Sequence, residues 1–100
     1  MNIQFTAPVW LWHAEKASWW FVTLPPEATD QVRFAMRGRP RKGFGSVKVK
    51  VKLGGSEWRT SLFPDKARDS YLLPIKASVR KAEGLLQGGD VAVALTLVDI

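Results

Sequence analysis

The sequence contains no cysteine and only one histidine, and these scarcities narrow the chemistry open to the chain. Without cysteine there can be no disulfide, no thiolate nucleophile and no zinc–thiolate site. The chain has no second histidine to join His13 in a conventional metal site. Counting residues leaves a Ser–His–acid triad open, but no Gly-x-Ser-x-Gly elbow or equivalent accompanies it. The nine carboxylates are scattered, with no pair placed for general acid–base catalysis. The sequence therefore favours a non-enzymatic protein without a metal or a cofactor.

Long apolar runs are missing as well. No stretch approaches the roughly 20 residues that cross a bilayer, and residues 1–22 lack the early basic residues of a signal peptide. We therefore expect a cytoplasmic protein. Its 100 residues, 46% of them hydrophobic, predict a single domain over residues 1–100. The net charge of +6 favours encounters with nucleic acid or other anions, although a small domain also needs net charge to stay soluble.

The clearest pattern in the chain predicts a β-hairpin over Phe44–Pro64. Its first strand alternates apolar residues with lysine, and its second alternates apolar with polar residues, as expected for a sheet with one face in the core. A two-residue turn at Gly54-Gly55 places Val51 opposite Trp58. A slip of one residue would place Val51 opposite Arg59, so the hydrophobic pattern selects the first register.

Further strands are predicted at residues 3–7, 9–12, 19–24, 70–73 and 91–98. Pro8 cannot donate to a sheet ladder, so we expect it at an edge or a bulge, and we expect Pro74 to end its strand. Two short helices follow the prolines. The apolar side of the first is formed by Ala28, Val32, Ala35 and Met36, with Gly38 as its cap, and that of the second by Ile75, Val79, Ala82 and Leu86, with Gly84 as its cap.

The order of these elements repeats. A strand, a Leu-Pro pair, a helix, a loop and an alternating strand occur once around Pro25 and again around Pro74, about half the chain later. The two halves, approximately residues 1–53 and 54–100, are each too small to bury their own apolar face. We therefore predict a mainly β fold in which they close together about a pseudo-twofold axis into a six-stranded barrel with two short helices.

Three segments, Trp58–Pro64, Tyr71–Pro74 and Val79–Ala82, resemble the small prokaryotic family of unknown function DUF1905. That resemblance covers nearly the whole chain and implies a double-split β-barrel, with no assigned activity. The last third of the chain also resembles the swapped-hairpin domains of AbrB-type regulators, through its Leu-Pro pair, its helix and the Gly-Asp turn at Gly89. Glu83, however, stands where those domains have an apolar residue.

The first functional hypothesis is a binding module for an anionic small molecule or peptide. Lys50 and Arg59 face each other across the predicted hairpin, an unfavourable pairing of like charges unless an anion lies between them. Ser61 lies on the same strand face as Arg59, and Lys76 and Arg80 are further candidates for this site. The alternative interpretation is a solvated surface, on which long side chains avoid each other at little cost.

The second hypothesis, from another class, is a nucleic-acid-binding protein of AbrB-like ancestry. Its candidate residues are Arg37, Arg39, Arg41, Lys42 and Lys48, which would contact phosphates without reading sequence. A solvated basic loop explains the same cluster.

Four of the five tryptophans, Trp10, Trp12, Trp19 and Trp20, lie in the first predicted hairpin and on both of its faces. Core packing accounts for most of them, but an exposed aromatic patch would mark a ligand-binding or dimer surface. We expect a monomer and keep a dimer as the alternative.

Overall fold

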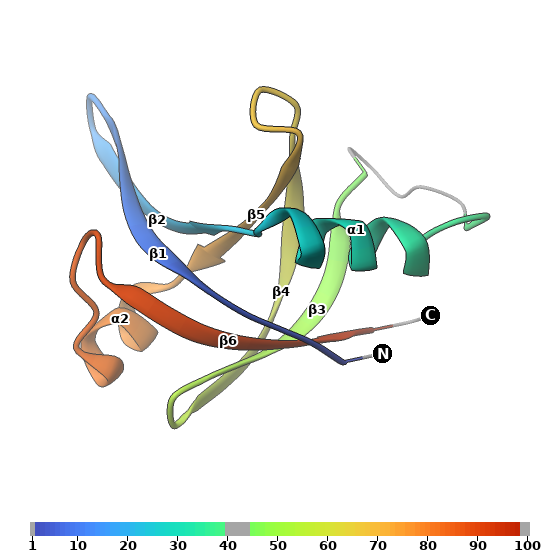
Figure 1. Ribbon diagram of the computed structural model, residues 1–100. Helices are drawn as coiled ribbons and strands as arrows, with labels where there is room; N and C mark the ends of the chain where they lie inside the picture. The colour runs from blue at the N-terminus through green and yellow to red at the C-terminus, as the bar shows by residue number, and fades with distance from the viewer. Residues whose placement is uncertain (1, 40–44, 99–100) are drawn as a thin grey trace.

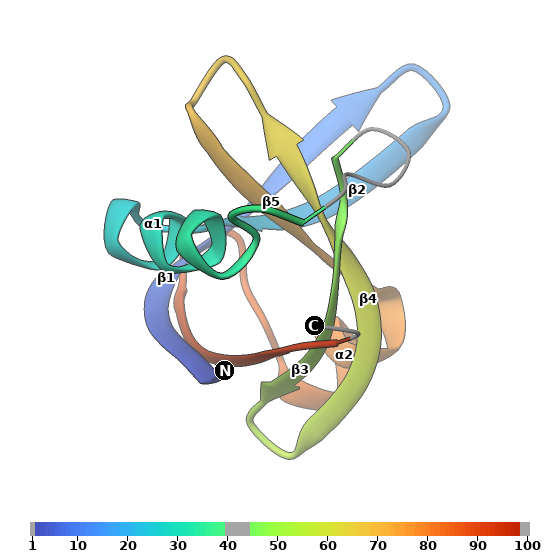
Figure 2. The same cartoon turned by 90° about the vertical axis from the view of Figure 1, so that its right-hand side faces the viewer.

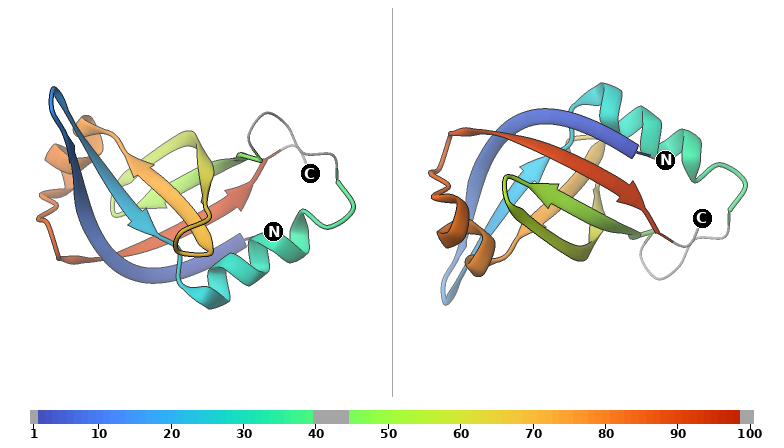
Figure 3. Two further views of the ribbon diagram at one scale, coloured as in Figure 1. Left: turned by 90° about the horizontal axis from the view of Figure 1, so that it is seen from above. Right: turned by 90° about the horizontal axis from the view of Figure 1, so that it is seen from below.

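The computed structural model describes residues 2–39 and 45–98. In this part of the chain six strands close into an antiparallel barrel, and two helices lie at opposite ends of it (Figures 1 and 3). In chain order the elements are β1 (Asn2–Ala14), β2 (Ala17–Thr23), α1 (Pro26–Ala35), β3 (Val47–Leu53), β4 (Ser56–Asp65), β5 (Ser70–Ile75), α2 (Ala77–Glu83) and β6 (Asp90–Leu97). The predicted fold class is confirmed.

The strand order around the barrel is β1-β2-β5-β4-β3-β6. This order is unchanged when β1, β2 and β3 are exchanged for β4, β5 and β6, so the two halves of the chain occupy equivalent places in the topology. Only two contacts, β2 with β5 and β3 with β6, map onto themselves under the exchange. These two seams join the halves into one barrel together with the β1–β6 and β3–β4 pairings, which the exchange converts into each other.

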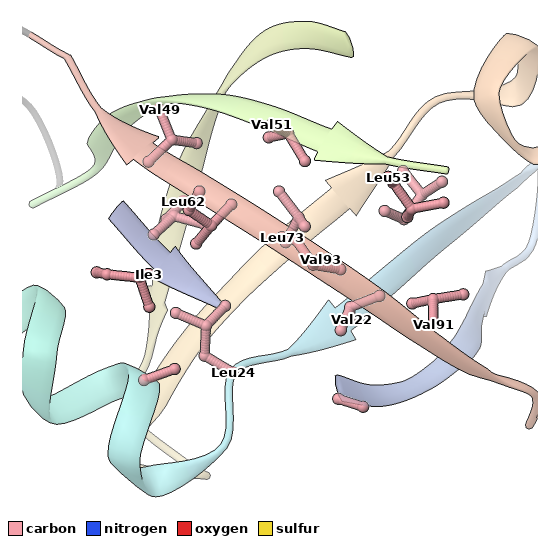
Figure 4. Close-up of a cluster of buried hydrophobic side chains, with 14 of the residues drawn as sticks. Ile3, Val22, Leu24, Val49, Val51, Leu53, Leu62, Leu73, Val91 and Val93 are labelled. Carbon is pink, nitrogen blue, oxygen red and sulfur yellow. The ribbon is translucent and has the colours of Figure 1, made fainter. Parts of the chain in front are cut away.

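The core fills the barrel with branched aliphatic side chains (Figure 4). Along β3 and β6 the alternation predicted from the sequence holds, with every second residue buried. At one seam Val22 of β2 faces Leu73 of β5, and at the other Val51 of β3 faces Leu95 of β6. All four side chains are fully buried, so both of these seams are apolar.

The β3–β4 hairpin has the predicted register, with Val51 opposite Trp58 and Lys50 opposite Arg59. Its turn is held from outside by α2. The Ser56 hydroxyl donates to one carboxylate oxygen of Glu83 at 2.7 Å, and the Gly55 N–H donates to the other at 3.3 Å. Glu83, which departs from the AbrB pattern, therefore ties the last turn of α2 to this hairpin.

Replacing Glu83 with alanine should lower the free energy of unfolding by about 1–2 kcal/mol, because two donors lose a charged acceptor. Urea denaturation followed by circular dichroism measures the change. Glu57→Ala is the matched control, since Glu57 is exposed beside the same turn and its loss should cost less than about 0.5 kcal/mol. Equal effects of the two substitutions would show that the Glu83 contact contributes nothing.

The prediction that Pro74 ends its strand was wrong, whereas Pro8 lies at a local strand edge, as predicted, although β1 is not broken there. β1 continues through Pro8, and β5 continues through Pro74, which pairs with Phe21. Pro8 lies where β1 changes partner, since the strand pairs with β6 up to Pro8 and with β2 from Val9. A proline is tolerated at such a place because one side of the strand no longer needs its N–H.

The helices differ from the prediction in detail. α1 ends at a Met36 cap in right-handed conformation, and Gly38 takes its positive φ in the turn that follows, so Gly38 is not the cap. Gly84 caps α2 in the left-handed conformation, as predicted. Only Val79 of the predicted apolar side is a buried α2 residue; Ile75 belongs to β5, and Leu86 lies beyond the helix with 76% of its surface exposed. α2, which spans Ala77–Glu83, is too short to include all four residues of the predicted apolar side.

Candidate functional site

The barrel is split at two equivalent places. β1 leaves β6 and joins β2 at Pro8–Val9, and β4 leaves β3 and joins β5 at Leu62–Phe63. A cavity lies beside each split, one of about 550 Å³ against α1 and one of about 520 Å³ against α2. Each is bounded by the changing strand, by its neighbour, by the start of the following helix and by the tip of the hairpin from the other half. The internal repeat therefore produces two cavities with the same architecture and different side chains.

The cavity against α2, which we call the cationic cavity, is lined by aromatic and basic side chains. Trp58 comes from β4, Trp20 from β2, Lys76 from the N-cap of α2 and Arg80 from within the helix. The guanidinium carbon of Arg80 lies 4.8 Å from the centroid of the Trp20 ring. Stacking of this kind fixes the plane of the guanidinium while its N–H edge stays available for a carboxylate or phosphate.

The charge in the cationic cavity is not balanced locally. No acidic side chain in the described chain lines it, and within residues 2–39 and 45–98 no ion pair holds Lys76 or Arg80. Thr60 and Ser18 add hydroxyls to its walls. A low-polarity aromatic wall beside two unpaired cations is an arrangement that binds a planar or apolar group carrying a negative charge.

The equivalent cavity against α1, the mixed cavity, has a different charge balance. Arg33 of α1 donates to Asp69 at 2.6 Å across its mouth, and Asp30 adds a second carboxylate. The buried Thr29 hydroxyl donates to the Leu24 carbonyl, and the buried Ser70 hydroxyl has no partner in the described part of the chain. Because the carboxylates oppose the arginines, this cavity lacks the net positive charge of its counterpart.

A third hollow, the aromatic groove, lies between the two hairpins that diverge in Figure 2. Its volume is about 520 Å³. Trp10 packs on Phe21 with ring centroids 5.2 Å apart and donates from its indole N–H to Thr23 at 2.9 Å. Trp12 and Trp19, which face each other across the hairpin, are 47% and 53% exposed. The predicted exposed aromatic surface is therefore present on this side of the molecule.

Arg68 closes one side of the aromatic groove. Its guanidinium carbon lies 4.7 Å from the Trp10 ring centroid, and its N–H donates to Asp65 at 2.7 Å. This hydrogen bond holds the pKa of the Asp65 carboxyl below its usual value of 3.8, an effect opposed in part by desolvation. Asp65 thus stays ionised at neutral pH and neutralises Arg68, so the groove offers apolar contact more than charge.

The five residues predicted for the anion site fall into two groups. Lys76 and Arg80 line the cationic cavity. Lys50 and Arg59 are exposed neighbours on the outer face of β3 and β4, and Ser61 lies on the same face opposite Lys48. The structure brings Arg80 together with Trp20 and Trp58, which were missed as site residues because no local pattern in the sequence joins them.

The residues predicted for nucleic-acid binding are also dispersed. Arg37 and Arg39 line a hollow of about 400 Å³ beyond α1, where the Arg37 guanidinium carbon lies 5.3 Å from the centroid of the exposed Phe34 ring. Lys48 lies on the outer face of β3. Arg41 and Lys42 lie outside the described residues.

Within residues 2–39 and 45–98, no three histidine or carboxylate side chains gather into a group able to hold a metal ion. No helix in the same residues has the length and apolar character to span a membrane.

Comparison with known families gives one match. The model of the family described as "Domain of unknown function (DUF1905)" matches residues 5–95, nearly the whole barrel. No curated protein matches the chain. The likeness to AbrB-type domains stays a prediction.

Proposed function

This chain belongs to the DUF1905 family, and on that premise we propose that it is a binding module for anionic ligands with a planar apolar body. The ligand occupies the cationic cavity. Arg80 and Lys76 bind its carboxylate or phosphate, and Trp20 and Trp58 pack against its body. The observation that carries this proposal is the pairing of unopposed positive charge with an aromatic wall in one cavity.

The geometry supports this site over the outer face around Arg59. A charged hydrogen bond contributes most where water is partly excluded, and Trp58 is only 8% exposed and Ile75 5% exposed at the cavity wall. Lys50 and Arg59 stand in open solvent, where an ion pair is worth at most about 1 kcal/mol.

Binding of 2-naphthoate tests the proposal. It should quench tryptophan fluorescence with a saturable, salt-sensitive curve, because the probe would lie against two indoles and two cations. The neutral isostere 2-naphthamide is the matched control and should bind at least tenfold more weakly. Equal binding of acid and amide, or no saturable binding of either, would reject the function.

Nucleic-acid binding is the second candidate, favoured by one observation. Lys48, Lys50 and Lys52 are exposed in a row on the outer face of β3, with Arg59 beside them on β4. If this row contacts phosphates, electrophoretic mobility shift of a random duplex should weaken steeply between about 50 and 200 mM salt. Absence of any shift at low salt would eliminate this candidate.

A further inference from the structure

The cationic cavity and the aromatic groove lie next to each other. Trp19, Phe63 and Pro74 line both hollows, one residue from each of the three strands that meet there. Trp19 and Phe63 are 53% and 45% exposed, so the boundary between the hollows is itself an apolar surface. A ligand long enough to leave the cavity would pass directly onto the groove.

The backbone beside this boundary is also open. β2 pairs with β5 only between Trp20 and Thr23, so Ala17–Trp19 pair with β1 alone among the described strands. An exposed strand edge of this kind accepts an additional extended segment through its N–H and carbonyl groups. Ser18, in the middle of this edge, is part of the cationic cavity.

We propose that this combined surface binds the free carboxyl end of an extended peptide that carries apolar side chains. The terminal carboxylate lies at Arg80 and Lys76, and the preceding residues run past Trp19 and Phe63 into the groove toward Trp12. Alternate side chains of an extended segment point to the same side. Apolar residues at every second position of the partner would therefore meet the aromatic floor.

Three features favour a peptide over a small molecule alone. Positive charge is concentrated at one end of the surface, where Lys76 and Arg80 meet no carboxylate, whereas in the groove Asp65 neutralises Arg68 and leaves Lys66 as the one excess cation among the described lining residues. The apolar surface around Trp19 and Phe63 is too long for one planar ring, because it extends across two hollows of about 520 Å³ each. The third feature is the open strand edge at Ala17–Trp19, which lies beside this apolar surface. This inference rests on the proposed function of the cationic cavity and extends it to the groove.

Fluorescence anisotropy of an amino-terminally labelled Ser-Phe-Ser-Phe-Ser-Phe peptide tests the inference. The peptide with a free carboxylate should bind at least tenfold more tightly than the same peptide amidated, and at least tenfold more tightly than 2-naphthoate. Trp12→Ala should reduce the peptide's advantage over 2-naphthoate about tenfold, because Trp12 lies in the groove outside the cavity. Phe34→Ala, at another exposed aromatic far from both hollows on α1, is the control and should change neither affinity.

The outcomes separate the two proposals. If 2-naphthoate does not bind, the proposed function fails, and the peptide inference that rests on it fails too. If 2-naphthoate binds but the peptide binds no more tightly, or if amidation or Trp12→Ala has no effect, the peptide inference fails and the anion site stands. A wild-type dimer in sedimentation experiments that Trp12→Ala dissociates would show that a second copy covers the groove, which also overturns the peptide inference.

Discussion

Replacing Leu73 with alanine should lower the free energy of unfolding by about 3 kcal/mol, the largest stability effect expected for a single truncation at the seam. Leu73 is fully buried and faces Val22 across the β2–β5 contact, one of the two seams that map onto themselves when the halves of the chain are exchanged. A large-to-small substitution there loses the burial of the side chain and leaves a cavity that the rigid seam cannot close. For a domain of this size, such a loss is a large part of the total stability.

Urea denaturation of the Leu73→Ala variant measures the change, with Leu86→Ala as the control. Leu86 is the same residue type with 76% of its surface exposed, so its truncation should cost less than about 0.5 kcal/mol. Similar costs for the two variants would mean that the β2–β5 contact is not a packed junction of the barrel.

Replacing Arg80 with glutamine should weaken 2-naphthoate binding about ten- to hundredfold. The substitution removes a charge-assisted hydrogen bond worth about 1.5–3 kcal/mol and the stacking partner of Trp20. Arg80→Lys keeps the charge without the planar stacked donor and should fall between wild type and Arg80→Gln. Calorimetric titration gives the affinities, and thermal denaturation without ligand shows whether each variant is folded.

Arg59→Gln is the matched control for Arg80. Arg59 is exposed on the outer face of β4, opposite Lys50, and its loss should leave 2-naphthoate affinity within twofold of wild type. A larger loss for Arg59→Gln than for Arg80→Gln would assign the anion site to the outer face.

The fold was predictable where the pattern in the sequence is local. Alternating lysine and valine on β3, with Gly54-Gly55 at the turn, sets the β3–β4 register because any slip exposes the apolar set. The repeated Leu-Pro element indicated the two equivalent halves. The sequence predicts a strand end at Pro74, because proline cannot donate to a sheet ladder. The strand continues instead because β5 pairs with β2, where Pro74 faces Phe21, a partner more than fifty residues away. Nothing near Pro74 in the sequence carries that information.

The candidate site was less predictable for the same reason. Lys76 and Arg80 are candidates because of their charge alone. Trp58 is predicted on the core face opposite Val51, and Trp20 belongs to a hairpin whose tryptophans are interpreted either as core or as a ligand-binding or dimer surface. Trp20 meets Arg80 only because β2 pairs with β5 and α2 follows β5 directly. The cationic cavity itself lies where β4 changes partners at Leu62–Phe63, and this change of partner depends on closure of the whole barrel. Because the cavity forms only when the whole barrel closes, no short sequence motif predicts it.

The most direct measurement is a nitrogen–proton correlation spectrum of the five tryptophan indole groups, recorded during titration with 2-naphthoate. The indole signals of Trp20 and Trp58 should shift, and the same titration with 2-naphthamide should leave them nearly in place. Shifts confined to Trp10 and Trp12, or shifts of equal size with the amide, would contradict an anion site between Trp20, Trp58 and Arg80.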